Sequence, residues 1–367
     1  MFAAAIRTMS RAALATIHLG ALRRNLARVR ERATGAKVMA IIKADGYGHG
    51  LERVARALGD ADAFGVAALG DGLRLRAAGI ASRIVVLSGP DEAADLVEFR
   101  RLRLDAVVHH ESQLRWLEAD RDPRTLRVWL KLDTGMHRLG LAPEDAAHAH
   151  ERLRALANVA AEIALMTHLA ASDEFDNDLT TRQIEAFDAA TSELAGVRSM
   201  ANSAALLGWP PARGDWVRAG GLLYGLSVIP GKTGIDLGFE PAMTLSTRLI
   251  SVKNIKKGES IGYAATWQCP EDMAVGVAAI GYGDGYPRSA PSTTPVLVNG
   301  VRAAIVGRVS MDLIAIDLRQ APGAQVGDRV VLWGRGLPVE EIADHAGTIS
   351  YDLTCGMTKR VLFVEED

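Results

Sequence analysis

The sequence predicts an α/β protein in two parts, an N-terminal (β/α)8 barrel followed by a mostly antiparallel β domain. Short apolar strands alternate eight times with amphipathic helices over roughly the first two hundred residues, the pattern of a (β/α)8 barrel. After Leu226 the chain becomes β-rich, with turns such as Asn299-Gly300. We therefore expect the barrel over residues 12–238 and the β domain over residues 239–367.

A first strand is expected over Ala12–His18 and a helix over Leu19–Arg32. The barrel strands are then expected at Lys37–Lys43, Ala63–Ala67, Ile84–Ser88, Asp105–His109, Val128–Asp133, Glu162–His168, Val197–Asn202 and Trp216–Ala219. Helices with apolar faces, such as Ala146–Leu156 and Thr181–Leu194, lie between them. A doubly wound open sheet is the alternative, because periodicity does not show that a sheet closes.

The second part is expected to contain one short helix, near Pro338–His345. Its strands are expected at Met243–Lys253, Ser260–Trp267, Ala274–Tyr282, Pro295–Val298, Arg302–Val306, Leu313–Leu318 and Arg329–Trp333.

Composition excludes several classes of protein. The net charge is -2, with 49% hydrophobic and 23% charged residues, so nothing favours nucleic-acid binding or disorder. No apolar run is long enough to span a bilayer. Two cysteines cannot form a disulfide framework, which favours a cytoplasmic location. Arginines interrupt the apolar start of Met1–Ser10, so we expect no signal peptide, and Met9 could be an alternative start.

One stretch, Val38–Gly50, organises the prediction of function. Five apolar residues end abruptly at Lys43, which is followed by a segment rich in glycine. A lysine at the end of a buried strand is costly, and its best-known chemistry is a Schiff base with a carbonyl. The alternative is a solvated lysine that merely ends the strand.

Polar residues also follow the other expected strands, at the end where barrel enzymes place their active sites. They are Lys131 and Asp133 after the fifth strand, His168 after the sixth, Asn202 and Ser203 after the seventh, and Arg218, Gly220 and Gly221 at the eighth. Ser203 with the two glycines could hold a phosphate through a hydroxyl and backbone N–H groups. A simple turn at Gly220-Gly221 is the alternative.

The run Lys43-Ala44-Asp45-Gly46-Tyr47-Gly48-His49-Gly50 resembles the cofactor-lysine motif of the alanine racemase family, and the likeness extends over nearly the whole chain. The resemblance implies a barrel followed by a β domain that the first strand joins. It also implies pyridoxal 5'-phosphate (PLP) as cofactor, bound through Lys43. The residues that match the family's phosphate-binding positions are Tyr47, Ser203, Gly220 and Gly221. No metal is expected.

Further matches imply further roles. Arg218 matches the arginine that contacts the cofactor ring nitrogen, and His168 a histidine that hydrogen-bonds both this arginine and the tyrosine base. Arg138, in Lys131-Leu132-Asp133-Thr134-Gly135-Met136-His137-Arg138-Leu139-Gly140, matches the arginine for the substrate carboxylate. Lys131 matches a lysine that is carbamylated in some members. Racemisation removes a proton from one face of the α-carbon and returns one to the other, and Tyr263 matches the second base beside Lys43.

Two more segments resemble the family. Tyr282 lies in one that resembles the entry gate. Met311 and Asp312 lie in Gly307-Arg308-Val309-Ser310-Met311-Asp312, where the methionine N–H meets the substrate carboxylate in the family. The chain departs from the family near its end, where Lys359 stands at the position of a second gate tyrosine, which puts substrate selectivity in question.

The resemblance predicts a PLP-dependent two-base racemase that interconverts L- and D-alanine, supplying D-alanine for peptidoglycan or for alanine catabolism. It also implies a homodimer in which the tyrosine base comes from the partner subunit. A racemase with a preference for serine or lysine is one alternative, and a PLP-binding carrier without turnover is another. The β domain that carries Tyr263 argues against the carrier.

Overall fold

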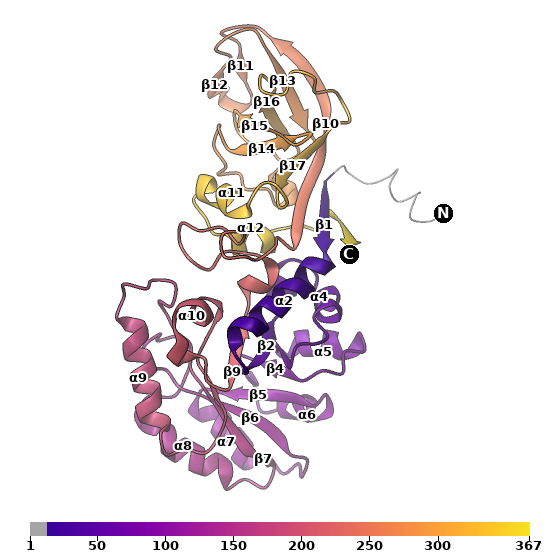
Figure 1. The fold of residues 1–367 in the computed structure, drawn as a ribbon. Coiled ribbons are helices and arrows are strands. Elements are labelled where there is room, and N and C mark those ends of the chain that lie inside the picture. Colours follow the sequence, from indigo (N-terminus) through magenta and orange to yellow (C-terminus); the bar gives the residue numbers. More distant parts are fainter. Residues whose placement is uncertain (1–12) are drawn as a thin grey trace. The chain divides into compact units, whose positions relative to one another are not determined.

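The computed structural model describes residues 13–367, so the expectations for Met1–Ser10 and for Ala12 lie outside the described residues. Two compact units divide the chain (Figure 1). The barrel unit contains residues 23–223 and 228–231, and the β unit contains residues 13–22, 224–227 and 232–367. Each unit is described separately below.

The barrel unit is built on eight parallel strands, in the order β8-β7-β6-β5-β4-β3-β2-β9. Their bounds are β2 (Lys37–Ile41), β3 (Ala63–Val66), β4 (Ile84–Val86), β5 (Leu104–Val108), β6 (Leu126–Lys131), β7 (Val159–Met166), β8 (Arg198–Ser199) and β9 (Trp216–Ala219). The Arg218 N–H donates to Ala201 O at 2.9 Å and the Asp215 N–H to Arg198 O at 2.9 Å, which joins the two ends of the sheet. The predicted (β/α)8 barrel is therefore confirmed, and the open sheet is excluded.

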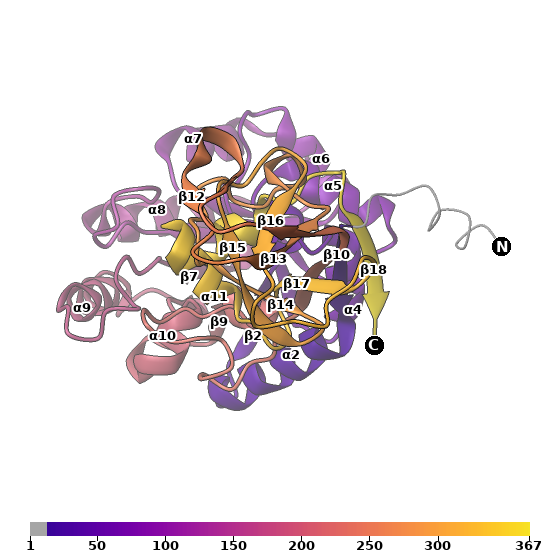
Figure 2. The same cartoon turned by 90° about the horizontal axis from the view of Figure 1, so that it is seen from above.

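Helices follow the strands around the barrel (Figures 1 and 2). They are α2 (Leu19–Ala33), α4 (Leu51–Ala57), α5 (Leu69–Ala77), α6 (Asp95–Arg101), α7 (Glu111–Ala119), α8 (Ala146–Arg154), α9 (Leu179–Thr191) and α10 (Ser203–Gly208). Helices α8 and α9 lie within two or three residues of the bounds expected from apolar periodicity. A five-residue element, α3 (Lys43–Tyr47), was not expected.

Alternate residues of the strands fill the interior of the barrel. Met39, Ile41, Val107, Trp129 and Trp216 belong to one buried cluster, in which the two tryptophan rings meet edge to face at 5.6 Å. Near the amino ends of the strands, the buried carboxylate of Asp105 accepts hydrogen bonds from Arg83, Arg127 and the Trp129 indole. Side chains thus fill this end of the interior, and the arginines compensate the charge of Asp105, as expected for the stabilising face of such a barrel.

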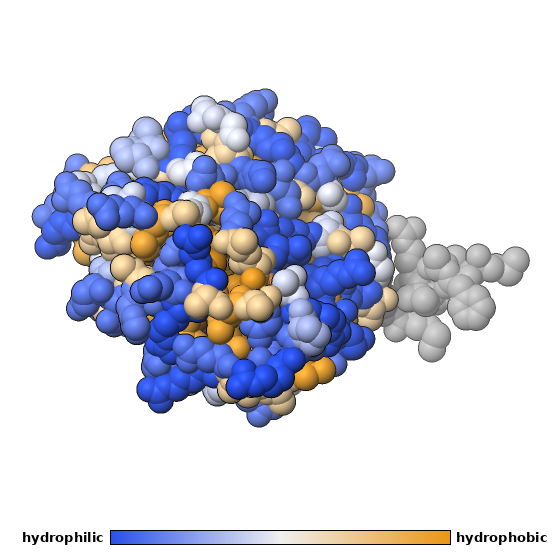
Figure 3. Space-filling view, turned by 90° about the horizontal axis from the view of Figure 1, so that it is seen from below, coloured by the Kyte–Doolittle hydropathy of each residue, from blue (hydrophilic) through white to orange (hydrophobic). Residues whose placement is uncertain are grey.

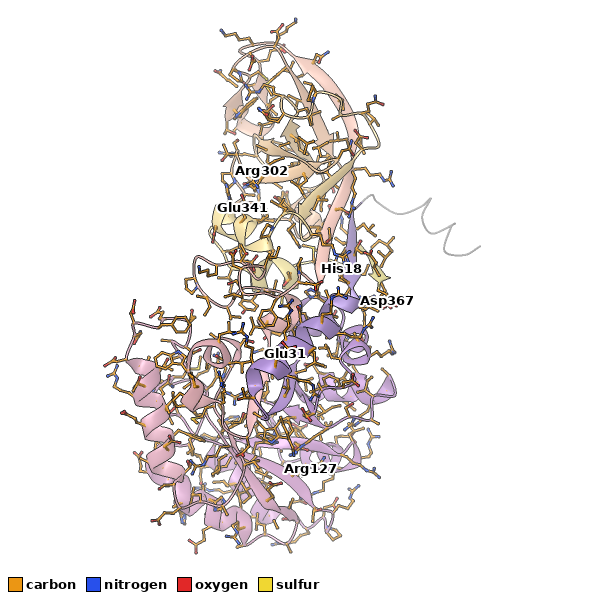
Figure 4. All side chains as sticks on the ribbon, viewed as in Figure 1. His18, Glu31, Arg127, Arg302, Glu341 and Asp367 are labelled. Atoms are coloured by element: carbon orange, nitrogen blue, oxygen red, sulfur yellow. The ribbon has the colours of Figure 1, made fainter. Side chains whose placement is uncertain are left out.

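The barrel face seen from below is mainly hydrophilic, with hydrophobic residues gathered near the centre of the view (Figure 3). Arg127, labelled in Figure 4, belongs to the barrel unit and pairs with Asp105 at 2.7 Å.

The β unit contains a closed ring of six antiparallel strands, in the order β10-β13-β16-β15-β14-β17 and back to β10. The strands are β10 (Met243–Ile255), β13 (Met273–Ala278), β14 (Pro295–Val298), β15 (Val301–Val306), β16 (Ile314–Asp317) and β17 (Arg329–Trp333). Strand β10 is 13 residues long, and a register shift between Leu249 and Ser251 lets its two halves pair with different neighbours. The predicted turn at Asn299-Gly300 joins β14 to β15 with both residues at positive φ.

Both ends of the described chain lie in the β unit. Strand β1 (Leu14–His18) is antiparallel to β10 and parallel to the final strand β18 (Leu362–Glu366). Two helices, α11 (Val339–Ala346) and α12 (Ser350–Cys355), stand where one was expected. Arg302 of β15 and Glu341 of α11 point toward each other and form an ion pair that ties the helix to the ring (Figure 4).

Two sequence expectations for this unit were wrong. The segment Ser260–Trp267 is not one strand but a hairpin of β11 (Ser260–Ile261) and β12 (Trp267–Gln268), because Gly262, Ala264 and Ala265 take positive φ and reverse the chain. The strand expected to run to Tyr282 ends at Ala278, and Tyr282–Asp284 forms a short 3-10 turn.

Candidate functional site

The mouth of the barrel, at the carboxyl ends of the strands, collects basic side chains. Side chains two residues apart on a strand share a face, so residues two positions beyond the inward cluster also turn toward the barrel axis. Those positions hold Lys43, His109, Lys131, His168 and Arg218. The charges of Arg218, Arg138 and Lys43 all act on Lys131. The mouth therefore suits an anionic ligand.

His109 is the one of these residues to which the sequence analysis gave no role. It follows Val108, which pairs with Leu130, so it lies next to Lys131 across the parallel ladder. Its Nε2 is 2.9 Å from the Ser88 carbonyl oxygen. Burial lowers the pKa of His109, and the charge of Lys131 adds to this effect. The two-residue step that leads from Trp129 to Lys131 would have identified His109 as well.

Lys43 begins a left-handed turn. Ala44, Asp45, Gly46 and Tyr47 all have φ between 52° and 63°. The N–H of Gly46 donates to Ile42 O at 2.9 Å, and that of Gly48 to Ala44 O at 3.0 Å. Left-handed backbone costs an L-residue roughly 1–2 kcal/mol, and such strain is typical of functional segments.

Replacing Ala44 with glycine should relieve part of this strain. We expect Ala44→Gly to raise the free energy of unfolding by about 0.5–1 kcal/mol, because glycine adopts positive φ without a steric penalty. Urea denaturation measures the change. Ala57→Gly, in the right-handed helix α4, is the matched control and should lower stability by about 1 kcal/mol. Equal losses in the two variants would contradict the assignment of strain to Ala44.

Arg218 is buried on β9, with 5% of its surface exposed. Its Nη1 donates to the Ser199 carbonyl (2.9 Å) and hydroxyl (2.7 Å), and its Nη2 to the carbonyls of Thr167 (2.6 Å) and Met200 (3.0 Å). Burial lowers its pKa to about 10, so it stays charged at neutral pH. Within residues 13–367 its Nε makes no hydrogen bond, which leaves one donor for a ligand at the mouth.

His168 accepts a hydrogen bond at Nδ1 from Nη2 of Arg218, at 3.1 Å. Since arginine can only donate, the ring proton of His168 must lie on Nε2. Burial lowers the pKa of His168 well below its usual value, and the charges of Arg218 and Lys131 lower it further. The ring is therefore neutral at pH 7 and can donate through Nε2.

We therefore expect the His168 ring to stay neutral over the pH range in which histidines usually become protonated. Two-dimensional 1H–15N NMR of ring-labelled protein should give one histidine with the Nε2–H tautomer and constant shifts from pH 8 to 5.5. The signal should disappear in His168→Gln. A midpoint near 6.5 for the signal that this variant removes would rule out the neutral ring.

The four residues predicted to hold a phosphate come together. The Gly220 N–H donates to Oγ of Ser203 at 2.8 Å. A Cβ added to Gly220 would lie 2.7 Å from Oη of Tyr47, so only glycine fits between the two hydroxyl groups. Gly221 begins the 3-10 turn that follows. Two hydroxyls and the backbone at two glycines thus form a polar cradle of the kind that can hold a phosphate.

Lys131 and Arg138 lie at the start and near the tip of the loop after β6. Burial lowers the pKa of Lys131 to about 8, and the charges of Arg218 and Arg138 contribute. A lysine with this pKa is partly neutral at physiological pH, which allows its amine to react with CO2. Arg138 is exposed.

The remaining predicted residues lie in the β unit. Tyr263, at the tip of the β11–β12 hairpin, has 69% of its surface exposed. The Tyr282 N–H donates to Ser310 O at 3.1 Å and the Gly283 N–H to Met311 O at 2.9 Å, which joins the two predicted segments. A Cβ on Gly307 would lie 2.9 Å from Ile261 O, so the hairpin is next to them.

Asp312 is held by a residue that the sequence analysis did not assign. Arg360 pairs with the buried Asp284 at 3.0 Å and also with Asp312. It therefore links the Tyr282 turn to the Met311 segment. The departure from the family at the neighbouring Lys359 leaves this link intact.

A barrel with basic residues at the carboxyl ends of its strands, joined in one chain to a ring of antiparallel strands, defines a class of two-domain barrel enzymes. Two family models match it: "Alanine racemase, N-terminal domain" over residues 17–228 and "Alanine racemase, C-terminal domain" over residues 242–364. The chain belongs to the alanine racemase family, a family of isomerases, which confirms the predicted resemblance.

The sequence of the chain matches those of its relatives over nearly their whole length. It is 48% identical to the alanine racemase of Coxiella burnetii over 358 residues (96% of this chain, 98% of the relative) and 49% identical to that of a Shewanella species over 347 residues (95% and 97%). Its structure resembles that of the biosynthetic alanine racemase from Pseudomonas aeruginosa (TM-score 0.94, 43% identity, covering 97% and 100%) and that of the Acinetobacter baumannii enzyme (0.92, 33%, 97% and 100%).

No helix in residues 13–367 is both long and apolar enough to cross a membrane. The same residues contain no group of three or more His, Cys, Asp or Glu side chains placed to hold a metal ion.

Proposed function

We propose that the protein interconverts L- and D-alanine with pyridoxal phosphate, using Lys43 and Tyr263 as its two bases. The observation that carries the proposal is the set of side chains at the mouth of the barrel, which offers groups suited to the phosphate and to the ring nitrogen of this cofactor. The Ser203–Gly220–Tyr47 cradle suits its phosphate, and the hydrogen-bonding capacity left at Arg218 Nε suits its ring nitrogen. When bound, the cofactor supplies a carbonyl group and an electron-withdrawing ring that acidify the α-hydrogen of an amino acid.

The residues of this chain divide the remaining work. Nζ of Lys43 takes or returns the proton on one face of the α-carbon, and Oη of Tyr263 does so on the other. Arg138 and the Met311 N–H bind the substrate carboxylate. Arg218 would hold the ring nitrogen of the cofactor, and since a guanidinium can only donate a hydrogen bond, it would leave that nitrogen unprotonated.

His168, Lys131, Tyr282 and Asp312 support this set. The neutral His168 accepts from Arg218 at Nδ1 and so keeps an Nε2 donor, which in the proposed dimer would serve Tyr263 of the partner subunit. Lys131, once carbamylated, would present oxygens to Arg138, whereas the unmodified ammonium repels it. Tyr282 forms part of the entrance through which the substrate reaches the active site. The ion pair of Asp312 with Arg360 keeps the Met311 segment in position.

We also propose a homodimer with shared active sites. Tyr263, Tyr282 and Met311 are large apolar residues that are exposed on neighbouring segments of the β unit, with exposed fractions of 69%, 37% and 52%. A cluster of this kind on a monomer favours a protein interface. In this dimer, Tyr263 of one protomer faces Lys43 of the other. The cytoplasmic location and the supply of D-alanine for peptidoglycan or catabolism stay predictions.

A racemisation assay with L-alanine, L-serine and L-lysine tests the activity, and borohydride reduction followed by peptide mass mapping tests the cofactor. We expect alanine to turn over fastest and the reduced adduct to map to Lys43. Faster turnover of serine or lysine would favour a racemase of different preference. An adduct without turnover of any amino acid would favour a carrier.

A further inference from the structure

Backbone hydrogen bonds close the base of the loop that carries Arg138. At its two ends, the Leu141 N–H donates to Lys131 O at 2.9 Å and the Asp133 N–H to Leu141 O at 2.8 Å. Gly140 has φ 141°, and a Cβ there would lie 2.4 Å from the Asp133 nitrogen, so only glycine allows this approach. The ends of the loop are thus fixed at the end of β6.

Asp133 organises the interior of the loop. Its Oδ1 accepts three backbone hydrogen bonds, from Gly135 (3.1 Å), Met136 (3.1 Å) and His137 (2.9 Å). These are the three N–H groups before Arg138, and His137 is held at φ 55°. One carboxylate oxygen therefore sets the path of the backbone up to the arginine.

The same loop is tied to the buried arginine of β9. Thr134 Oγ1 lies 2.8 Å from Thr167 Oγ1, which donates to Leu132 O at 3.0 Å. Thr167 also offers its carbonyl oxygen to Arg218 at 2.6 Å. The loop and Arg218 therefore share one rigid support.

We propose that Asp133 is a positioning residue that holds Arg138 in place for the carboxylate of the amino-acid substrate, and that it does so by accepting backbone hydrogen bonds at Oδ1. This inference rests on the proposed function. Without Oδ1, three N–H groups lose their acceptor, and the backbone before Arg138 is no longer held in one conformation. The guanidinium of Arg138 then reaches the substrate carboxylate in only a fraction of the loop conformations.

Three variants test the mechanism. Asp133→Ala should raise the KM for alanine about ten-fold or more and change kcat less than about three-fold, because binding of the carboxylate is weakened at the ground state. Asp133→Asn keeps an oxygen at the same place and should recover most of the loss. Asp236→Ala is the matched control, since Asp236 accepts from Thr233 in a loop of the β unit, and its KM should not change.

A double-mutant cycle shows whether Asp133 acts through Arg138. In an Arg138→Ala background, adding Asp133→Ala should change KM less than about two-fold. A full ten-fold effect in that background, an unchanged KM in Asp133→Ala, or no recovery in Asp133→Asn would each overturn the proposal.

A second readout does not depend on turnover. Amide hydrogen exchange should speed up at residues 135–137 in Asp133→Ala and remain slow in the wild type and in Asp236→Ala. Unchanged exchange at these residues would also overturn the proposal. If the wild type failed to racemise alanine while exchange behaved as expected, the proposed function would fail and the role of Asp133 in the loop would stand.

Discussion

Lys43→Ala should lose at least about 10⁴-fold of the racemisation rate and should give no borohydride-stable adduct. In the proposed mechanism, this variant removes both the attachment of the cofactor and one of the two bases, and a general base alone contributes roughly 10²–10⁴-fold. Coupled assays in both directions measure the rate, and mass spectrometry measures the adduct.

Lys37→Ala is the control for Lys43→Ala, because Lys37 begins strand β2, which ends two residues before Lys43, and its Nζ lies 5.4 Å from the centre of the Trp216 ring. It should keep the adduct and most of the activity. Adduct formation on another lysine in Lys43→Ala would mean that the cofactor site has been misassigned.

Tyr263→Phe should lower the racemisation rate by roughly 10²–10⁴-fold in both directions, since each direction needs a proton donor or acceptor on the Tyr263 face. The adduct on Lys43 should persist, which separates this variant from Lys43→Ala. The matched control is Tyr286→Phe. Tyr286 is buried in the same unit, and its hydroxyl finds no hydrogen-bond partner among residues 13–367, so its loss should leave the rate unchanged.

The proposed sharing of active sites between protomers can be tested with the same two variants. Mixed dimers of Lys43→Ala and Tyr263→Phe chains contain one site with both bases intact, so mixing two inactive proteins should restore activity. Subunit exchange is followed with differently tagged chains. No activity after exchange has been demonstrated would contradict the sharing of sites between protomers.

The barrel could be predicted in advance because its signal is periodic and local. Buried parallel strands appear as short apolar runs, and the polar residue that ends each run is visible in the sequence, as at Lys43, Lys131 and His168. His109 also ends an expected strand, Asp105–His109, but it received no role. Its place beside Lys131 depends on the register of the two strands, which the sequence does not show. Hydrogen bonding was equally invisible. Nothing in the sequence indicates that Asp133 gathers three N–H groups or that Arg360 joins Asp284 to Asp312.

Backbone strain explains the error at Ser260–Trp267. Tyr263 was assigned to a strand because its neighbours are apolar and β-prone, yet Ala264 and Ala265 take positive φ, which alanine does not signal. The turn after Lys43 is similar, since only one of its four left-handed residues is glycine. Such conformations are imposed by tertiary contacts, and a pattern of residue types does not record them.

The pairing of β1 with β10 and β18 also determines the order in which a newly made chain can fold. Each strand of the barrel finds its neighbours by the time Trp216–Ala219 has been synthesised. Leu14 pairs with Ser246 and Leu362, so the first strand made has no partner until late in translation. At ribosomal speeds of 5–20 residues per second, this wait is roughly 12 to 46 s for Ser246 and roughly 17 to 70 s for Leu362. The barrel is therefore complete on the ribosome before the β unit can close, and the exposed edge of β1 is the segment most in need of protection from misfolding.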